Sequence, residues 1–335
     1  MAAVVAPAVR TPAQVAAAKA MDHVGVRDEL AQLPWPEGGT VETHDERPVV
    51  VGVDASDSAR AAADWAGDLA AVWGAPLHLL HSVPADAPVR AASPAWLREL
   101  ADKAESAGAG ASRADVVPGD TIELLTDRAD RARMLVLGSY GEGASSGMLA
   151  GAVALALAGT VPCPVAVVRG VAPRVAPPRT GPVVVGVDGS ATAHAAALLA
   201  ADIAASMGAP LVAVHAWSDL AETESGLRRM HDDWAQLAEQ GGAALAEEVR
   251  AVSEVRPALD VRPDLVRDTP LRALLRRAQD ARMLVVGHRG GRVAEGMGLG
   301  STSRALVEFA PCPVVVTPPV PAPVVPATHT TDPAR

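Results

Sequence analysis

The sequence predicts an α/β protein made of two tandem, doubly wound, five-stranded parallel sheets of the Rossmann-like kind. Three observations indicate this fold: the chain contains one unit twice, each unit alternates strand-like with helix-like segments, and the strand-like segments are almost wholly apolar. A strand in a parallel sheet that is covered on both faces reads as a continuous hydrophobic run. We therefore expect helices on both faces of each sheet.

The duplication is visible in four paired segments. RPVVVGVDAS (47–56) matches GPVVVGVDGS (181–190), and GAPLHLLHSV (74–83) matches GAPLVAVHAW (208–217), each pair 134 positions apart. Two later pairs, RARMLVLGSYGEG with DARMLVVGHRGGR and TVPCPVAVV with FAPCPVVVT, are 149 positions apart. The difference is an insertion of 15 residues in the second copy, within 218–254. A unit of about 125 residues is therefore present twice.

The first half of each copy is predicted to form a strand, a helix and a second strand. A run of valines flanked by glycine is typical of a buried strand. The Ala-rich segment after it favours a helix, because Ala has the highest helix propensity. The expected elements are strand 48–54, helix 57–72 and strand 76–83 in the first copy, and strand 182–188, helix 191–207 and strand 210–217 in the second.

The second half of each copy is predicted to add three helices and three strands. The fourth strand is MLVLG or MLVVG, a glycine-rich loop follows it, and the last strand comes after PCPV. The expected helices lie near 94–108, 120–131 and 151–160 in the first copy, and near 226–253, 269–279 and 301–309 in the second. In such sheets ligands bind beyond the carboxyl ends of the strands, where the strand order reverses.

Composition shifts set the domain boundaries. The segments outside the two copies are rich in Ala, Val and Pro, a composition that favours disorder or extended backbone. We expect a disordered extension at 1–46 with one short helix near 11–20, domains at 47–169 and 182–317, a semi-stiff Pro-rich linker at 170–181, and a disordered Pro-rich tail at 318–335.

Composition and charge narrow the class of function. The net charge of −10 and the 2 % of aromatic residues argue against a nucleic-acid surface. No apolar run approaches the roughly 18 residues of a membrane span, and the N-terminus lacks a signal-peptide core, so we expect no membrane contact and a cytoplasmic location. Cys163 and Cys312, each within PCPV, are expected to be small buried residues rather than metal ligands or a disulfide.

One glycine-rich loop carries the chemistry. Residues 285–306 read VVGHRGGRVAEGMGLGSTSRAL, with six glycines from Gly287 to Gly300. A Walker A loop is excluded, because the only lysines, Lys19 and Lys103, are far from any such loop. A dinucleotide fingerprint is excluded, because VDAS or VDGS follows the first strand instead. The glycine-rich pattern that these exclusions leave is Gly-x2-Gly-x9-Gly-Ser, which lies between the fourth strand and the last helix of the second copy.

This spacing suits a phosphate group. Gly287 and Gly290 let backbone N–H groups face inward as a nest for phosphate oxygens. Gly300 and Ser301 begin the next helix, where free N–H groups and the helix dipole favour an anion. The Ser301 hydroxyl can donate to a phosphate or approach a metal ion. The alternative is an ordinary glycine-rich turn with Ser301 as a plain N-cap.

The first copy keeps the glycine spacing but loses the hydroxyl. Gly138, Gly141 and Gly151 match the pattern, whereas Ala152 stands where the second copy has Ser301. We therefore expect weak or absent nucleotide binding in the first copy, which would serve mainly as a structural partner.

The sequence resembles the universal stress protein family, in its tandem two-domain form with an ATP-binding motif. The family pattern G-x2-G-x9-G-[ST] is met at every fixed position in the second copy, and VVVGVDGS, LVRDTPLRALLRRA and APCPVVV extend the resemblance over about 48–168 and 182–317. The resemblance implies the strand order 3-2-1-4-5, ATP with or without Mg²⁺, and a role in stress response. It also implies that the copies pair through their last strands as an intramolecular pseudo-dimer, and it leaves a homodimer of the whole chain open.

The resemblance further implies which residues bind the nucleotide. Asp188 would contact the nucleoside, and Ala216 and Val286 would line the adenine pocket. Asp188 could instead hold Mg²⁺ or only order the end of its strand. The implied set is Gly186, Asp188, Ala216, Val286, Gly287, Gly290, Gly300, Ser301 and Thr302, with Asp54, Gly138, Gly141 and Gly151 as weaker counterparts in the first copy.

Other polar residues are weaker candidates. His81 and His215 recur at equivalent strand ends, where we expect local hydrogen bonds rather than catalysis. His288, Arg289 and Arg292 lie in the glycine loop and either approach phosphates or are simply solvated. No Ser/His/Asp set has supporting spacing.

Two classes of function follow. The first is a nucleotide-binding regulatory protein that an unidentified protein partner reads; it is not an enzyme, and any ATP hydrolysis is slow and incidental. The second is a nucleotide-independent interaction or scaffold module built from the two packed copies. An ATP-pyrophosphatase is disfavoured, because VDGSATA lacks an SGGxDS-like loop.

Overall fold

The computed structural model of the protein describes most of the two copies, which we call repeat 1 (47–169) and repeat 2 (182–317). The described residues are 45–87, 93–141, 150–172, 174–218, 220–223, 226–229, 234–290 and 298–319. The expected extension, its short helix near 11–20 and the Pro-rich tail lie outside the described residues, except for positions 45, 46, 318 and 319.

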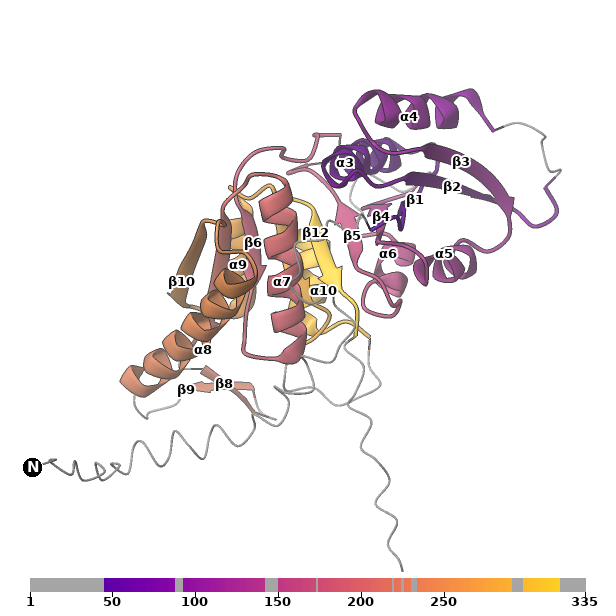
Figure 1. Ribbon diagram of the computed structural model, residues 1–335. Helices are drawn as coiled ribbons and strands as arrows, with labels where there is room; N and C mark the ends of the chain where they lie inside the picture. Colours follow the sequence, from indigo (N-terminus) through magenta and orange to yellow (C-terminus); the bar gives the residue numbers. More distant parts are fainter. Residues whose placement is uncertain are drawn as a thin grey trace, which may run out of the picture. The chain divides into compact units, whose positions relative to one another are not determined.

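Ten strands form one sheet (Figure 1). Repeat 1 supplies β1 (Val49–Gly52), β2 (Leu77–Val83), β3 (Ser112–Pro118), β4 (Met134–Gly138) and β5 (Val165–Val168). Repeat 2 supplies β6 (Val183–Gly186), β7 (Leu211–Trp217), β10 (Val261–Arg267), β11 (Met283–Gly287) and β12 (Val314–Thr317). The order across the sheet is β10-β7-β6-β11-β12-β5-β4-β1-β2-β3. Each half therefore has the expected order 3-2-1-4-5.

The two halves join through their last strands. β12 pairs with β5 in antiparallel fashion, with Val314 opposite Val167 and Val316 opposite Val165, whereas the neighbouring pairs β11–β12 and β4–β5 are parallel. The expected pairing of the copies within one chain is confirmed. The two predicted five-stranded sheets are consequently halves of one continuous ten-stranded sheet.

Helices cover both faces of the sheet. The described helices are α3 (Asp57–Trp73), α4 (Ala95–Ser106), α5 (Thr121–Ala129), α6 (Ala152–Leu157), α7 (Ala191–Ser206), α8 (Trp234–Val255), α9 (Pro270–Ala278) and α10 (Ser301–Phe309). Helices α3, α4, α7 and α8 pack on one face, and α5, α6, α9 and α10 pack on the other. None of the described helices combines the length and apolarity needed to cross a bilayer.

Each face has one apolar core that spans both repeats. Leu69 of α3 and Ile203 of α7 are fully buried in the first core. Leu157 of α6 and Leu306 of α10 are buried in the second. Each buried leucine or isoleucine side chain stabilises the fold by about 1.5–3 kcal/mol relative to its exposed state. The repeats are therefore held together by side-chain burial as well as by the β5–β12 ladder.

The insertion in repeat 2 forms a hairpin where a helix was expected. Helix 226–253 was predicted from the polar pattern, but 226–229 is strand β9 (Gly226–Arg229), paired antiparallel with β8 (Leu220–Thr223). Helix α8 begins only at Trp234. Glycine is a poor helix former and suits a tight turn, so Gly226 favours the hairpin over a helix start.

The last helix of repeat 1 is shorter than predicted. Helix 151–160 was expected, but α6 runs from Ala152 to Leu157, and Gly159 has a φ of +74°. In repeat 2 the position equivalent to Gly159 is Glu308, and α10 continues to Phe309. A left-handed glycine ends a helix readily, because it lacks a Cβ atom.

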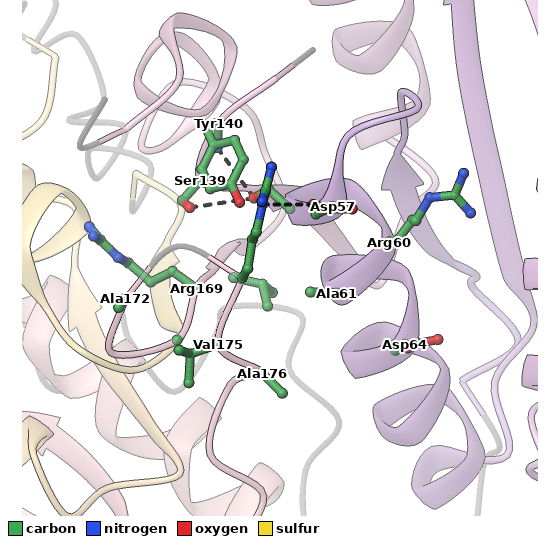
Figure 2. Close-up of a pocket in the computed structure, with 14 residues that line it drawn as sticks. Asp57, Arg60, Ala61, Asp64, Ser139, Tyr140, Arg169, Ala172, Val175 and Ala176 are labelled. Carbon is green, nitrogen blue, oxygen red and sulfur yellow. Dashed lines mark hydrogen bonds and ion pairs between the residues drawn. The ribbon is translucent and has the colours of Figure 1, made fainter. Parts of the chain in front are cut away.

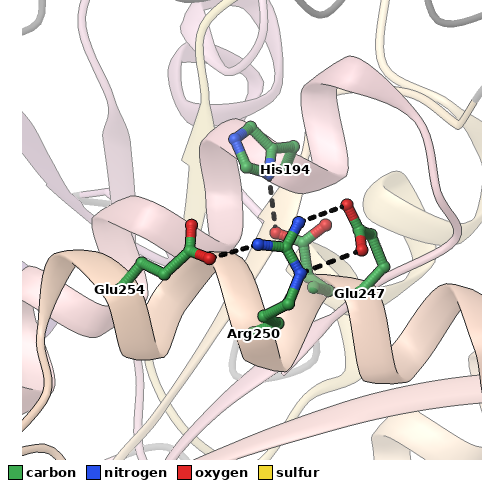
Figure 3. Close-up of polar contacts among 5 residues, drawn as sticks. His194, Glu247, Arg250 and Glu254 are labelled. Atoms are coloured by element: carbon green, nitrogen blue, oxygen red, sulfur yellow. Dashed lines mark hydrogen bonds and ion pairs between the residues drawn. The ribbon is translucent and has the colours of Figure 1, made fainter. Parts of the chain in front are cut away.

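Helices α7 and α8 are joined by a partly buried polar pair. His194 Nδ1 lies 2.7 Å from Glu248 Oε1, and the Glu248 side chain is 9 % exposed. Figure 3 shows this pair beside Arg250, which bonds to Glu247 and Glu254 on the exposed side of α8. The insertion therefore leads into a long helix that is anchored to the first turns of α7.

Candidate functional site

The end of β6 places a carboxylate at the edge of the sheet. Asp188 Oδ1 accepts a hydrogen bond from Ser190 N at 3.0 Å, and Ser190 Oγ accepts one from Ala193 N as the N-cap of α7. These bonds fix the orientation of the carboxylate. A Cβ atom on Gly290 would lie 2.5 Å from Asp188 Oδ2. The main chain of the glycine loop therefore passes directly beside the Asp188 carboxylate.

The start of the loop is held by hydroxyls from two helices. Thr192 of α7 donates from Oγ1 to Arg289 O. Ser303 of α10 is buried and donates from Oγ to Gly287 O at 2.7 Å. A Cβ atom on Gly287 would lie 3.1 Å from the carbonyl carbon of Thr192. A side chain at 287 would therefore press against Thr192 at the start of α7.

The sequence analysis did not predict that Thr192 and Ser303 hold the glycine loop. A signal for Thr192 was present: an Asp is followed two residues later by Ser, and four residues later by Ser or Thr, after the first strand of both repeats. In repeat 1 the corresponding Ser58 Oγ accepts a hydrogen bond from Tyr140 N. The recurrence therefore marks side chains that tie the first helix to the glycine loop.

The two ends of the glycine loop meet. Gly300 N donates to His288 O at 2.8 Å, and Arg289 Nε donates to Gly298 O at 2.6 Å. A Cβ atom on Gly300 would lie 3.4 Å from the Arg289 Cα atom. Residues 288 and 289 therefore lie against residues 298 and 300 at the base of the loop. Arg292 lies outside the described residues.

Helix α10 begins at this junction. Gly300 is its N-cap, with extended backbone (φ −61°, ψ 153°), and Ser301 is its first helical residue. The alternative prediction, that Ser301 is the N-cap of this helix, is therefore wrong. Ser301 is exposed, and Thr302 follows it as a partly buried residue. A glycine N-cap offers no side-chain acceptor, so the first-turn N–H groups of α10 and its positive dipole end remain open to an anion.

The expected adenine-pocket residues lie on the α9 side of the sheet. Val286 is 4 % exposed and shares an apolar cluster with Leu274 of α9 and Ala216 of β7. A Cβ atom on Gly186 would lie 3.0 Å from Leu274 Cδ1 and 3.6 Å from Val286 Cγ1. These strand-end residues therefore form an apolar floor next to Asp188.

The paired histidines hold strand ends together. His215 Nδ1 lies 2.9 Å from Val187 O, and His81 Nδ1 lies 2.9 Å from Val53 O. The expectation of local hydrogen bonding is confirmed. In repeat 2 this contact fixes the end of β7 against the backbone that leads to Asp188.

Repeat 1 has the same backbone frame with fewer hydroxyls. Asp54 Oδ1 accepts from Ser56 N at 3.0 Å, and a Cβ atom on Gly141 would lie 3.0 Å from Asp54 Oδ2. A Cβ atom on Gly138 would lie 2.8 Å from the Ser58 carbonyl carbon. After the N-cap Gly151, the three hydroxyl residues of repeat 2 are replaced by apolar ones: Ala152 for Ser301, Val153 for Thr302 and Ala154 for Ser303.

A separate cavity of about 320 Å³ lies on the α3 face of repeat 1 (Figure 2). It is bounded by the first turns of α3, by Ser139 and Tyr140 after β4, and by the linker from Gly170 to Ala176. The linker folds back on α3 through ion pairs from Arg174 to Asp57 and from Arg179 to Asp68. Both signs of charge meet at this cavity, and it lies apart from the glycine motif of repeat 2.

Within the described ranges, no three His, Cys, Asp or Glu side chains gather into a metal-binding group. The Asp188 carboxylate lies beside Gly290 of the glycine loop, and it bonds to Ser190 as described above.

A parallel sheet with the order 3-2-1-4-5, an acidic residue after its first strand and a glycine loop running into a helix define a doubly wound, Rossmann-like α/β protein. The chain matches the universal stress protein family over residues 46–169 and 180–318, and it belongs to that family.

Known relatives have a similar length. The chain is 34 % identical over 287 residues to universal stress protein Rv2005c of Mycobacterium tuberculosis, covering 80 % of this chain and 96 % of that protein. It is 31 % identical to universal stress protein Rv2623 of the same organism, covering 80 % and 95 %. A crystal structure of a universal stress protein from Archaeoglobus fulgidus has the same fold, with a TM-score of 0.59, 19 % identity, and 82 % and 98 % coverage.

Proposed function

We propose that repeat 2 binds ATP or a closely related nucleotide and that the protein acts as a nucleotide-dependent regulator. The observation that carries the proposal is the meeting of three groups at one sheet edge: the Asp188 carboxylate, the backbone of Gly287 and Gly290, and the open N-terminus of α10. Glycines at 287 and 290 let the loop backbone approach Thr192 and Asp188 closely, and a glycine-rich backbone of this kind can bind phosphate oxygens through its N–H groups.

The residues have distinct roles in this proposal. The first-turn N–H groups of α10 and the hydroxyls of Ser301 and Thr302 would hold phosphate oxygens. Asp188 would accept a hydrogen bond from the ribose or contribute one oxygen ligand to Mg²⁺. Ala216 and Val286 would contact the apolar face of the base.

Repeat 1 would bind nucleotide weakly or not at all. Its loop keeps the contact between Gly141 and Asp54, but Ala152 offers no hydroxyl and α6 has only six residues. The expected stoichiometry is one nucleotide per chain.

We propose binding rather than catalysis as the task of the site. The hydroxyl groups at the base of the loop form hydrogen bonds with backbone groups of the protein. Ser190 caps α7, Thr192 bonds to Arg289 O and Ser303 bonds to Gly287 O. Such groups hold the loop instead of activating water. The bound state would be read by a partner protein, through the surface that the glycine loop and α10 present.

Isothermal titration calorimetry with ATP and Mg²⁺ tests the proposal. We expect one site per chain in the wild type and weaker binding by Ser301→Ala. A hydrogen bond to a charged group contributes about 1.5–3 kcal/mol, so the affinity should fall roughly 10- to 100-fold. Trp217, at the end of β7 with Arg267 5.7 Å from its ring, gives an independent fluorescence signal.

The matched control is Ser206→Ala, which removes an exposed hydroxyl that bonds to Asp202 O at the end of α7. It should leave nucleotide binding unchanged. Two nucleotides per wild-type chain would overturn the assignment to repeat 2 alone. Absence of binding to ATP, ADP and AMP would overturn the proposal as a whole.

A second candidate function is a nucleotide-independent scaffold. The observation in its favour is the shared construction of the repeats, with both apolar cores and the β5–β12 ladder crossing between them. It predicts that wild-type protein and Ser301→Ala behave alike in every nucleotide titration.

A further inference from the structure

The turn after α6 in repeat 1 contacts the glycine loop of repeat 2. A Cβ atom on Gly159 would lie 2.8 Å from His288 Cβ and 3.1 Å from Leu299 Cδ2. His288 follows the first glycine of the motif, and Leu299 precedes the third. Since Gly300 N bonds to His288 O, both residues lie at the closed base of the loop. Repeat 1 therefore packs against the base of the loop, at His288 and Leu299.

Two features of the sequence make this close approach feasible. Repeat 1 ends its helix at Leu157, and Gly159 adopts a φ of +74°, where a residue with a side chain is strained. Repeat 2 has Glu308 at the equivalent position inside α10. The short helix and the glycine are thus specific to the repeat that faces the complete motif.

The His288 side chain is partly buried at this contact. Its Nδ1 atom is buried and has no hydrogen-bond partner among the described residues. Burial, followed by the nearby Arg289 charge, lowers the pKa of His288. The neutral ring therefore serves as packing between the loop and the Gly159 turn.

Repeat 1 also contacts the far end of α10. Arg169, which follows β5, donates from Nη1 to Glu308 O in the last turn of that helix. A cation near a helix C-terminus interacts favourably with the helix dipole. The helix whose N-terminus closes the glycine motif is therefore held at its C-terminus by the other repeat.

We propose that Gly159, assisted by Arg169, is a positioning residue through which repeat 1 fixes the loop and helix of the nucleotide site in repeat 2. The inference rests on the proposed nucleotide-binding function. The proposal gives repeat 1 a defined role. The glycine motif of repeat 1 lacks the hydroxyls, but the Gly159 turn of repeat 1 positions the complete motif of repeat 2.

The test is Gly159→Ala, which adds one methyl group against the His288 Cβ atom. The matched control is Gly208→Ala: Gly208 has a φ of +58°, and no atom lies within 4 Å of its Cβ position. Both changes impose the same backbone strain, but only the first reaches the loop. We expect Gly159→Ala to weaken Mg-ATP binding about tenfold and Gly208→Ala to leave it unchanged.

Hydrogen exchange in the nucleotide-free protein gives a second readout. Amides of residues 287–300 should exchange faster in Gly159→Ala than in Gly208→Ala. Equal exchange and equal affinity in the two variants would overturn the inference. If wild-type protein binds no nucleotide while the loop still responds to Gly159→Ala, the proposed function fails and the structural contact stands.

Two further comparisons distinguish the proposed contact from a general folding defect. His288→Gly removes the atom that the new methyl group meets, so the double variant Gly159→Ala/His288→Gly should lose less affinity than the two single losses combined. Arg169→Met should weaken binding, whereas Arg179→Met, which breaks only the ion pair with Asp68, should not. The proposal would be contradicted if the affinity losses of Gly159→Ala and His288→Gly were additive in the double variant. It would also be contradicted if Arg169→Met and Arg179→Met bound nucleotide with the same affinity.

Discussion

The carboxylate of Asp188 lies 2.5 Å from the position that a Cβ atom would take on Gly290. The two residues are far apart in sequence, one after β6 and the other in the loop after β11, and the parallel sheet brings them to one edge. The contact explains the second glycine of the motif by steric exclusion. It also places the loop backbone next to the one acidic group that the resemblance assigned to the nucleoside.

Gly290→Ala should therefore disrupt the nucleotide site more than the fold. The new methyl group forces either the Asp188 side chain or the loop backbone to move, and we expect at least about a tenfold loss of nucleotide affinity. Gly290 is exposed, so the midpoint of thermal unfolding should change little. Gly298→Ala in the same loop meets no atom within 4 Å and serves as the control. Equal affinities of the two variants would refute the steric explanation.

The sequence was sufficient for the features that repeat or alternate. The match of RPVVVGVDAS with GPVVVGVDGS predicted the duplication, and the apolar strands predicted a parallel sheet with helices on both faces. The start and end of α10 were predicted to the residue, because glycine precedes Ser301 and Pro311 follows Phe309 closely.

Features that depend on contacts between distant residues were not predictable. The bond from Thr192 to Arg289 O spans 97 positions, and neither residue type alone indicates a partner. The hairpin β8–β9 arose from an insertion with no counterpart in repeat 1, so the internal comparison offered no template for it. The early end of α6 depends on Gly159, whose role became clear only from its contact with His288.

Ser303→Ala should loosen the base of the glycine loop. The Ser303 hydroxyl is buried and donates to Gly287 O, so its loss leaves a buried carbonyl with one partner fewer. We expect a loss of about 1 kcal/mol in the free energy of unfolding, measured by urea titration. Ser206→Ala, which removes an exposed hydroxyl bonded to Asp202 O, should change it by less than about 0.5 kcal/mol. A Ser303 variant as stable as the Ser206 variant would contradict the anchoring role.

His194→Ala should destabilise the packing of α7 on α8 (Figure 3). The variant leaves Glu248, a carboxylate with a 9 % exposed side chain, without its partner on α7. The His194 side chain is 34 % exposed, so solvent reduces the cost, and we expect about 1–2 kcal/mol by urea titration. Replacing both residues by leucine should cost less than His194→Ala alone, because no buried charge remains.

Arg250→Ala is the control for this prediction. Arg250 bonds to Glu247 and Glu254, but all three side chains are about half exposed, and exposed ion pairs contribute little. Its effect on the free energy of unfolding should be smaller than that of His194→Ala, because solvent screens the exposed charges. A larger effect for Arg250→Ala than for His194→Ala would reverse the assignment of which pair holds the helices together.

The two cysteines should make the fold sensitive to alkaline pH. Burial raises the pKa of Cys163 and of Cys312 from the ordinary 9.0 to about 12. In the unfolded chain the thiols lose their protons near pH 9, whereas in the folded chain they keep them. The stabilisation is therefore complete below pH 9 and is lost as the pH rises towards 12. The slope reaches at most about 1.4 kcal/mol per pH unit for each thiol.

Urea titrations at pH 7 and pH 10 test this prediction against the double variant Cys163→Ala/Cys312→Ala. Other groups that titrate in this range are common to both proteins, so the difference between the two pH slopes reports the thiols alone. We expect the wild type to lose more stability than the variant between the two pH values. Both thiols should also resist Ellman's reagent at pH 8 until urea unfolds the protein, because the reagent reacts with thiolates that are in contact with solvent. Rapid labelling of the native protein would show that the PCPV segments open to solvent, and the raised pKa would then lose its physical cause.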